Sequence, residues 1–122
     1  MAYEDSKISV TIPAGSDLSA SQFCFVEVNS SGLLAVVGAG LHADGVLQND
    51  PNASGRAGEV AIAGIVQVKC GGVVTRGGPV ASDSAGKAVN ATTGNIILGT
   101  AMETGATGAI IGILFHPRGA SA

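Results

Sequence analysis

The chain has 122 residues, a net charge of −3 and only 12% charged residues. Its length indicates one domain of the usual size, roughly 100–200 residues. Its mean hydropathy is +0.43, but no apolar run approaches the ~18 residues of a spanning helix, so no membrane segment is expected. The six Lys and Arg residues are scattered, which argues against nucleic-acid binding.

Small side chains dominate the composition, with 19 glycines, no Trp and 3% aromatic residues. Burying such side chains contributes little free energy, since each buried CH₂ stabilises by about 0.8 kcal/mol. We therefore expect a modestly stable subunit that gains stability by associating with copies of itself. A glycine-rich fold with nothing attached is the alternative that the composition leaves open.

Residues 1–12 are expected to form an N-terminal arm, followed by a single β domain of residues 13–122. Apolar and polar side chains alternate in the second half of the arm, which indicates a strand with two unlike faces. The residues concerned are Ser6, Lys7, Ile8, Ser9, Val10, Thr11 and Ile12. The segment is either the first strand of the domain's own sheet or an arm that adds to a neighbouring protein's sheet by β-augmentation.

The next segments alternate between short apolar runs and turn residues. We expect a single helical turn at residues 17–22, with Asp17 or Ser16 as its cap. Strands are predicted at residues 23–28, 33–37 and 45–47, with a turn at 29–32 and an exposed loop at 49–58. The first of these strands contains two of the three Phe residues and should anchor the core.

The central stretch, residues 58–88, is interpreted as four short strands separated by glycine turns. Gly64 interrupts an apolar run, where glycine usually marks a bulge or a bend. After it, Ile65, Gln67 and Lys69 should share one face of a strand, and Val66 and Val68 the other. A positive φ is expected at residues 71–72, a strand at 73–75 and a type I turn at 83–86.

The remaining segments are a turn at 90–95, a strand at 96–98, a loop at 103–108 and a final buried strand at 109–115, followed by a loose tail. No helical period of useful length and no fixed-period internal repeat is visible. The fold class is therefore all-β and mainly antiparallel, a compact barrel or sandwich with little or no helix.

No catalytic, cofactor or metal constellation stands out. Residues 37–43 match the outline of a dinucleotide fingerprint, but the segment that follows has no room for the long helix which that mechanism needs. His42 and Asp44 are two apart and could interact, but a solvated turn histidine is the preferred interpretation of His42. The carboxylates Asp83 and Glu103 lie in turns, where capping of backbone N–H groups accounts for them. No cofactor or metal is expected.

The two cysteines, Cys24 and Cys70, each lie in an apolar strand pattern. Buried free thiols in a reducing cytosol are the simplest interpretation, and a disulfide between them stays open. The N-terminus has neither a cationic segment nor an apolar core, so no signal peptide is expected.

Several motifs occur in a definite order along nearly the whole chain. They are PAGSDLS at 13–19, FV at 25–26, GVLQNDP at 45–51, GEVAI at 58–62, GIVQVK at 64–69, GPVASDSAGKA at 78–88, LGTAME at 98–103 and IIGIL at 110–114. This ordered set resembles the small capsid decoration, or cement, proteins of tailed bacteriophages. Where that family often has Gly-Asp, this chain has Gly78-Pro79, so the local turn can differ.

The resemblance implies a β-clip-like fold and a virion structural protein, not an enzyme. It would be made in the host cytoplasm, bind the major capsid protein on the outer surface of the head, associate as a homotrimer and bridge neighbouring capsid subunits. The arm from Ser6 to Ile12 is the expected capsid-binding element. The strand containing Ile65, Val66, Gln67 and Val68 is the expected self-association element.

A different class of function remains as the alternative, namely a small β-barrel module that binds carbohydrate or protein at a virion or cell surface. Carbohydrate sites usually offer exposed aromatic rings for stacking. Tyr3 and three Phe residues are the only aromatic residues, and the Phe residues are predicted to be buried.

Overall fold

The computed structural model describes residues 7–120 and shows an all-β, antiparallel protein, as predicted. The elements in chain order are β1 (Ile8–Pro13), the 3₁₀ helix η1 (Ser19–Ser21), β2 (Phe25–Val28), β3 (Leu34–Val36), β4 (Gly45–Leu47), β5 (Ala57–Lys69), β6 (Pro79–Ser82), β7 (Ala88–Asn90), β8 (Gly99–Ala101) and β9 (Ile110–Phe115). Within the described residues, no helix is long and apolar enough to cross a membrane.

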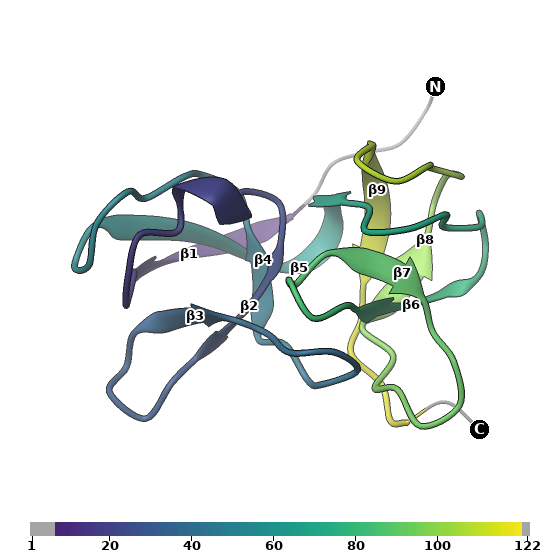
Figure 1. Ribbon diagram of the computed structural model, residues 1–122, viewed down its shortest axis with the longest axis horizontal. Coiled ribbons are helices and arrows are strands. Elements are labelled where there is room, and N and C mark those ends of the chain that lie inside the picture. Colours follow the sequence, from purple (N-terminus) through teal and green to yellow (C-terminus); the bar gives the residue numbers. More distant parts are fainter. Residues whose placement is uncertain (1–6, 121–122) are drawn as a thin grey trace.

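Strand β5 is the longest element, with 13 residues, and it connects two lobes that lie side by side (Figure 1). Its first half pairs with β1 and β4, and its second half pairs with β9. The change of partner occurs at Gly64, whose φ of +91° is in the left-handed region that favours glycine. The predicted bend at Gly64 is therefore confirmed, although the strand continues through it. We call residues 8–63 the N lobe and residues 64–120 the C lobe.

The two lobes have the same topology. The strand order is β3-β2-β4-β5-β1 in the N lobe and β7-β6-β8-β9-β5 in the C lobe. Each sheet curls until a parallel bridge joins its two edges, Ala14 with Leu34 in the N lobe and Cys70 with Ala88 in the C lobe. Closing a curled sheet in this way leaves few free strand edges.

The registers of the two lobes also correspond. Val28 pairs with Leu34 in the N lobe, and Ser82 pairs with Ala88 in the C lobe. Each residue of the second pair lies 54 positions after its counterpart in the first (82 − 28 and 88 − 34). The structure thus contains an internal repeat that is not visible as a fixed period in the sequence. The repeat is hidden in the sequence because only backbone geometry and a few turn residues are common to both lobes.

Equivalent turns use equivalent interactions. Asn29 Oδ1 accepts hydrogen bonds from the backbone of Ser31 and Leu33, and Asp83 Oδ1 accepts from Ala85 and Lys87. These carboxylate and amide oxygens replace backbone acceptors at the tip of a hairpin. The predicted turns at 29–32 and 83–86 are confirmed.

A second equivalent pair lies just before the hairpins, where Phe23 has a φ of +66° and Gly77 a φ of +80°. Each donates its backbone N–H to the strand after the hairpin, Phe23 to Leu47 O (2.7 Å) and Gly77 to Ala101 O (2.8 Å). A left-handed conformation is costly for a residue with a side chain. Phe23 therefore cannot begin the predicted strand, and β2 begins at Phe25.

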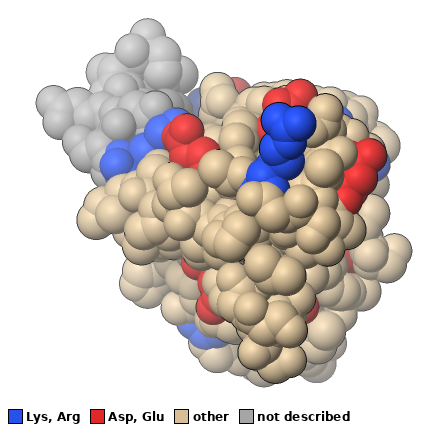
Figure 2. Space-filling view, turned by 90° about the vertical axis from the view of Figure 1, so that its left-hand side faces the viewer, with Lys and Arg blue, Asp and Glu red and all other residues tan. Residues whose placement is uncertain are grey.

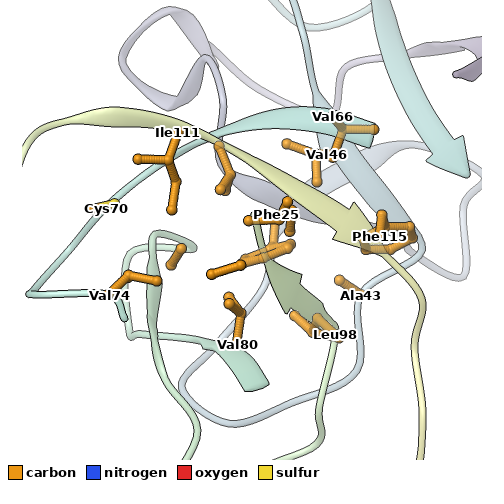
Figure 3. Packing of buried hydrophobic residues seen from close by; sticks show 14 of the residues in the cluster. Phe25, Ala43, Val46, Val66, Cys70, Val74, Val80, Leu98, Ile111 and Phe115 are labelled. Atoms are coloured by element: carbon orange, nitrogen blue, oxygen red, sulfur yellow. The ribbon is translucent and has the colours of Figure 1, made fainter. Parts of the chain in front are cut away.

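Apolar residues form two clusters. The smaller one fills the interior of the N lobe and contains Ala14, Leu18, Val26, Leu34, Leu47 and Val60. The larger one, which we call the junction cluster, fills the interior of the C lobe and also includes Phe25, Val46 and Ala61 from the opposite face of the N-lobe strands. Figure 3 shows Phe25 in the middle of this cluster, close to Phe115. Adjacent apolar residues occur in β2 (Phe25 and Val26) and in β4 (Val46 and Leu47) because the two faces of each strand meet different clusters.

Four details of the predicted elements were wrong. Residues 73–75 form no strand but a single bridge through Val74 to Gly105. Gly71 and Gly72 have no positive φ; Gly71 is needed because a Cβ there would overlap the Asp83 carboxylate. The strand predicted at 96–98 lies instead at 99–101, and the last strand is buried on only one face, with Ile110 and Leu114 exposed.

Candidate interaction surfaces

Strand β1 contains the residues predicted to bind the capsid, of which Ser6 lies outside the described residues. From Ile8 to Pro13 the chain pairs antiparallel with β5, so the segment is a strand of the protein's own sheet. Ile8 is 58% and Val10 37% exposed, whereas Ile12 packs against the N-lobe interior. Lys7 is half-buried and Ser9 and Thr11 are exposed.

The other edge of β1 carries no strand among the described residues, since β5 is the only partner of β1 in the sheet. Backbone N–H and C=O groups along such an edge are free to pair with an added strand. Pro13 ends β1 and provides no N–H there. The accessible part of this edge is therefore the stretch from Lys7 to Ile12.

The residues predicted for self-association lie on two opposite faces of β5. Val66 and Val68 point into the junction cluster and are 1% and 0% exposed. Ile65 and Gln67 point outward, opposite Leu114 and Gly112 of β9. A surface contact through this strand can thus use Ile65 and Gln67, which the alternation in the sequence had already placed on one face.

The outward face of β5 and β9 has a shallow hollow of about 190 Å³, lined in part by Ile65, Gln67 and Ile110. Glu103 lies at its edge, where Oε2 accepts a 2.9 Å hydrogen bond from Gly112 N. Sequence reasoning assigned Glu103 to a capping role in a turn, and this bond confirms that it holds a backbone N–H. Ile110 and Leu114 are 40% and 43% exposed on this face.

A second and larger hollow, of about 840 Å³, lies at the loop end of the N lobe. It is lined by Asp17, Ser19, Asn49, Asp50, Pro51, Asn52, Arg56 and Ala57. Ser19 donates to Asp17 Oδ1 from both its hydroxyl and its backbone N–H, and these bonds lower the pKa of Asp17. No aromatic side chain lines the hollow, so it offers no stacking surface for a sugar ring.

The two cysteines are free and buried, as predicted. Burial raises the pKa of both thiols, so the neutral form is favoured near neutral pH. Such thiols are poor nucleophiles because the thiolate is the reactive species. Cys24 and Cys70 are therefore packing residues.

The remaining polar candidates do not form a site. His42 Nε2 lies 3.6 Å from Asp44 Oδ1, with both side chains largely exposed, and His116 is exposed at the end of β9. Within residues 7–120, no group of His, Cys, Asp and Glu could hold a metal ion. Charged residues are sparse on the N-lobe side of the molecule, where basic and acidic side chains lie interspersed (Figure 2).

A comparison with protein-family models finds the phage cement protein family, which matches residues 3–114. The chain belongs to the phage cement protein family. This membership confirms the resemblance stated above and makes the protein a structural, non-enzymatic component of a phage head. The comparison with curated proteins finds no match.

Among solved structures, the chain is similar to the crystal structure of the head fiber gp8.5 N base of bacteriophage phi29. The TM-score is 0.71 at 18% sequence identity, and the match covers 95% of this chain and 98% of that one. At this identity the likeness shows a common fold.

Proposed function

We propose that this cement protein binds the outer surface of the head, contacts the major capsid protein through β1 and the residues before it, and stabilises the shell by bridging neighbouring capsid subunits. The observation that carries this proposal is β1 itself. It is an edge strand with a free ladder side, and its polar residues Lys7, Ser9 and Thr11 alternate with the exposed apolar Ile8 and Val10.

The sparse charge of the chain supports the same proposal. Low charge is typical of surface that becomes buried in an interface, where Lys, Glu and Asp are depleted. A protein repeated over the head also needs only weak individual contacts, because each bridge joins subunits that are already held in a lattice. We further propose that the protein associates as a homotrimer.

Two variants test the role of β1 without removing the strand, whose Ile12 supports the N-lobe core. The first lacks residues 1–7, and the second is Ser9→Lys/Thr11→Lys. Lysine at position 11 faces Glu59 across the sheet, so the strand itself is retained. The matched control is Ser84→Lys, in an exposed hairpin turn.

The measurement is binding of the purified protein to heads that lack it, followed by the temperature at which the decorated heads open. We expect both β1 variants to bind at least about tenfold more weakly, a loss of 1.4 kcal/mol or more, and the control to bind like the unaltered chain. Undiminished binding of both variants would remove β1 from the contact. Failure of the unaltered protein to bind any head would refute the proposed function.

A further inference from the structure

The internal repeat gives the two lobes equivalent surfaces, and the chain itself shows how one of them is used. On the outer face of the N lobe, a row of residues crosses three paired strands, namely Phe25, Val46 and Ala61. All three are 0% exposed and belong to the junction cluster. The ring centroid of Phe25 lies 6.3 Å from that of Phe115 in the C lobe (Figure 3). The C lobe therefore covers the outer face of the N lobe.

The equivalent row on the C lobe is uncovered. Pro79 pairs with Thr100, and Thr100 with Leu114, in the same register as the buried row of the N lobe. Leu114 is 43% exposed, Pro79 is exposed and Thr100 is half-buried. Ile65 extends the row on β5, opposite Leu114. Arg118 Nη2 donates a 3.3 Å hydrogen bond to Thr100 Oγ1 at one end of this row. The row therefore repeats the backbone register of the buried row, but no second lobe covers it among the described residues.

A second uncovered surface is the open end of the N lobe, by which we mean the mouth of its curled sheet at Val10 and Ile62. Val10 and Ile62 occupy the positions that Val66 and Phe115 have in the C lobe. Val10 and Ile62 are each 37% exposed, whereas Val66 is 1% and Phe115 4% exposed. The cause of the difference is that the N lobe covers the open end of the C lobe, while no described part of the chain covers the open end of the N lobe.

The outer face of the C lobe and the open end of the N lobe thus correspond to the two surfaces that meet at the junction within the chain. We propose that the outer face of the C lobe of one copy packs against the open end of the N lobe of a second copy, and so repeats between chains the junction that exists within each chain. Such a contact is heterologous and forms a closed ring when the rotation per copy closes. Three copies would place six lobes in succession around the ring. The inference rests on the self-association part of the proposed function and names its surface.

One acidic and one basic residue, Asp44 and Arg118, lie at corresponding places of the two surfaces, and Glu103 also lies at the edge of the outer C-lobe face. Asp44, whose side chain is 45% exposed, occupies the position that Leu98 has in the junction cluster. Ile97 occupies the position of Ala43 in that cluster, and its carbonyl accepts a 2.8 Å hydrogen bond from the backbone of Arg118. Repeating the junction brings Asp44 of one copy toward the Arg118 segment of the next. This attraction favours a head-to-tail contact over a face-to-face one.

The proposal leaves the polar face of β1 available to the capsid. The side chains of Ser9 and Thr11 point away from the N-lobe interior that Val10 and Ile12 border, because alternate residues of a strand face opposite sides. One strand can therefore serve both contacts, the apolar face toward a second copy and the polar face with the ladder edge toward the head.

The contact between Phe25 and Phe115 identifies the residues that should meet between copies, Pro79 and Ile62. The variants Ile62→Cys and Pro79→Cys are prepared separately, mixed in equal amounts and treated with a short bis-maleimide. We expect the mixture to crosslink and each variant alone to remain at background, since a head-to-tail contact brings neither residue near its own copy. The control is Val73→Cys, at a residue that is 64% exposed. Mixed with either Ile62→Cys or Pro79→Cys, it should crosslink only at background.

The reaction is run in solution over a concentration series and on protein bound to purified heads. Crosslinks within one variant alone, or background from the mixture in both settings, would overturn the proposal. Leu114→Asp and Ile62→Asp provide a second readout by sedimentation velocity. Each alone should self-associate at least about tenfold more weakly, because an unpaired carboxylate is costly to bury.

Mixing those two charged variants should restore dimers, because each still has one intact side of the junction. Weakened association that mixing does not rescue would contradict a heterologous contact. Failure of the unaltered chain to bind heads would refute the proposed function instead, and the crosslinks in solution decide the present inference independently of that result.

Discussion

Replacing Phe25 with alanine tests whether the junction between the lobes is a packed core. Phe25 is 0% exposed and lies against Phe115 with ring planes tilted by 31°. Its backbone N–H donates to Gly86 O (2.6 Å) in the other lobe, and its carbonyl accepts from Val37 N (3.1 Å). These bonds prevent the strand from moving into the space that the ring would leave, so the cavity stays open.

A fully buried Phe→Ala change costs about 3–5 kcal/mol, and a site that cannot collapse lies toward the upper end. We therefore expect a loss of about 4 kcal/mol from a total of about 6–18 kcal/mol for a chain of this length. With a urea m-value of about 2 kcal/mol/M, the unfolding midpoint should fall by about 2 M. The assay is urea unfolding followed by far-UV circular dichroism.

The matched control is Val73→Ala, at a residue that is 64% exposed, and it should change stability by no more than about 0.5 kcal/mol. A double-mutant cycle with Phe25→Leu and Phe115→Leu should show a coupling of about 0.5–1.5 kcal/mol between the rings. A loss below about 1.5 kcal/mol for Phe25→Ala would refute the reasoning that the lobes are joined by a close-packed cluster.

Three further predictions concern single residues. Gly99→Ala should lose about 1–3 kcal/mol in urea unfolding, because a Cβ there would overlap a carbonyl of β9, whereas Gly119→Ala, with open space around it, should be neutral. Glu103→Ala should cost about 1–3 kcal/mol by leaving a backbone N–H of β9 without its acceptor, and Glu103→Gln should recover most of that loss. The thiols of Cys24 and Cys70 should resist iodoacetamide until the chain unfolds, as judged by mass spectrometry. Because burial raises the pKa of both thiols, their contribution to stability is fully present at neutral pH and is lost as the pH rises past the ordinary cysteine value of about 8.5.

The comparison of sequence and structure shows why some elements could be predicted and others could not. The hairpin turns at 29–32 and 83–86 depend on Asx residues and a following glycine, which act within a few residues, so the sequence is sufficient. The strand predicted at 96–98 failed because Ile97 and Leu98 are apolar for a different reason. Leu98 enters the junction cluster from a loop, and the pairing falls on the next three residues.

In the interaction surfaces, too, features that depend on neighbouring residues could be predicted and features that depend on tertiary packing could not. Alternation along residues 65–69 correctly separated Ile65 and Gln67 from Val66 and Val68, since that alternation is a property of any strand. The polar Gln67 and Lys69 on one face also indicated that the strand has one drier face, but which element packs against that face could not be predicted from the sequence. For the same reason the exposure of Leu114, in a run that reads as uniformly apolar, could not be predicted.

By itself the amino-acid sequence determined the all-β class, the short strands with glycine turns, the low charge and the motif order of a phage cement protein, because each of these depends on local chemistry or on composition. Only the tertiary structure decided that the chain is two equivalent lobes, that one lobe covers the open end of the other, and that one junction surface is left at each end. Backbone hydrogen bonds define a register without requiring particular side chains. Two segments can therefore repeat the same fold while sharing almost no residues.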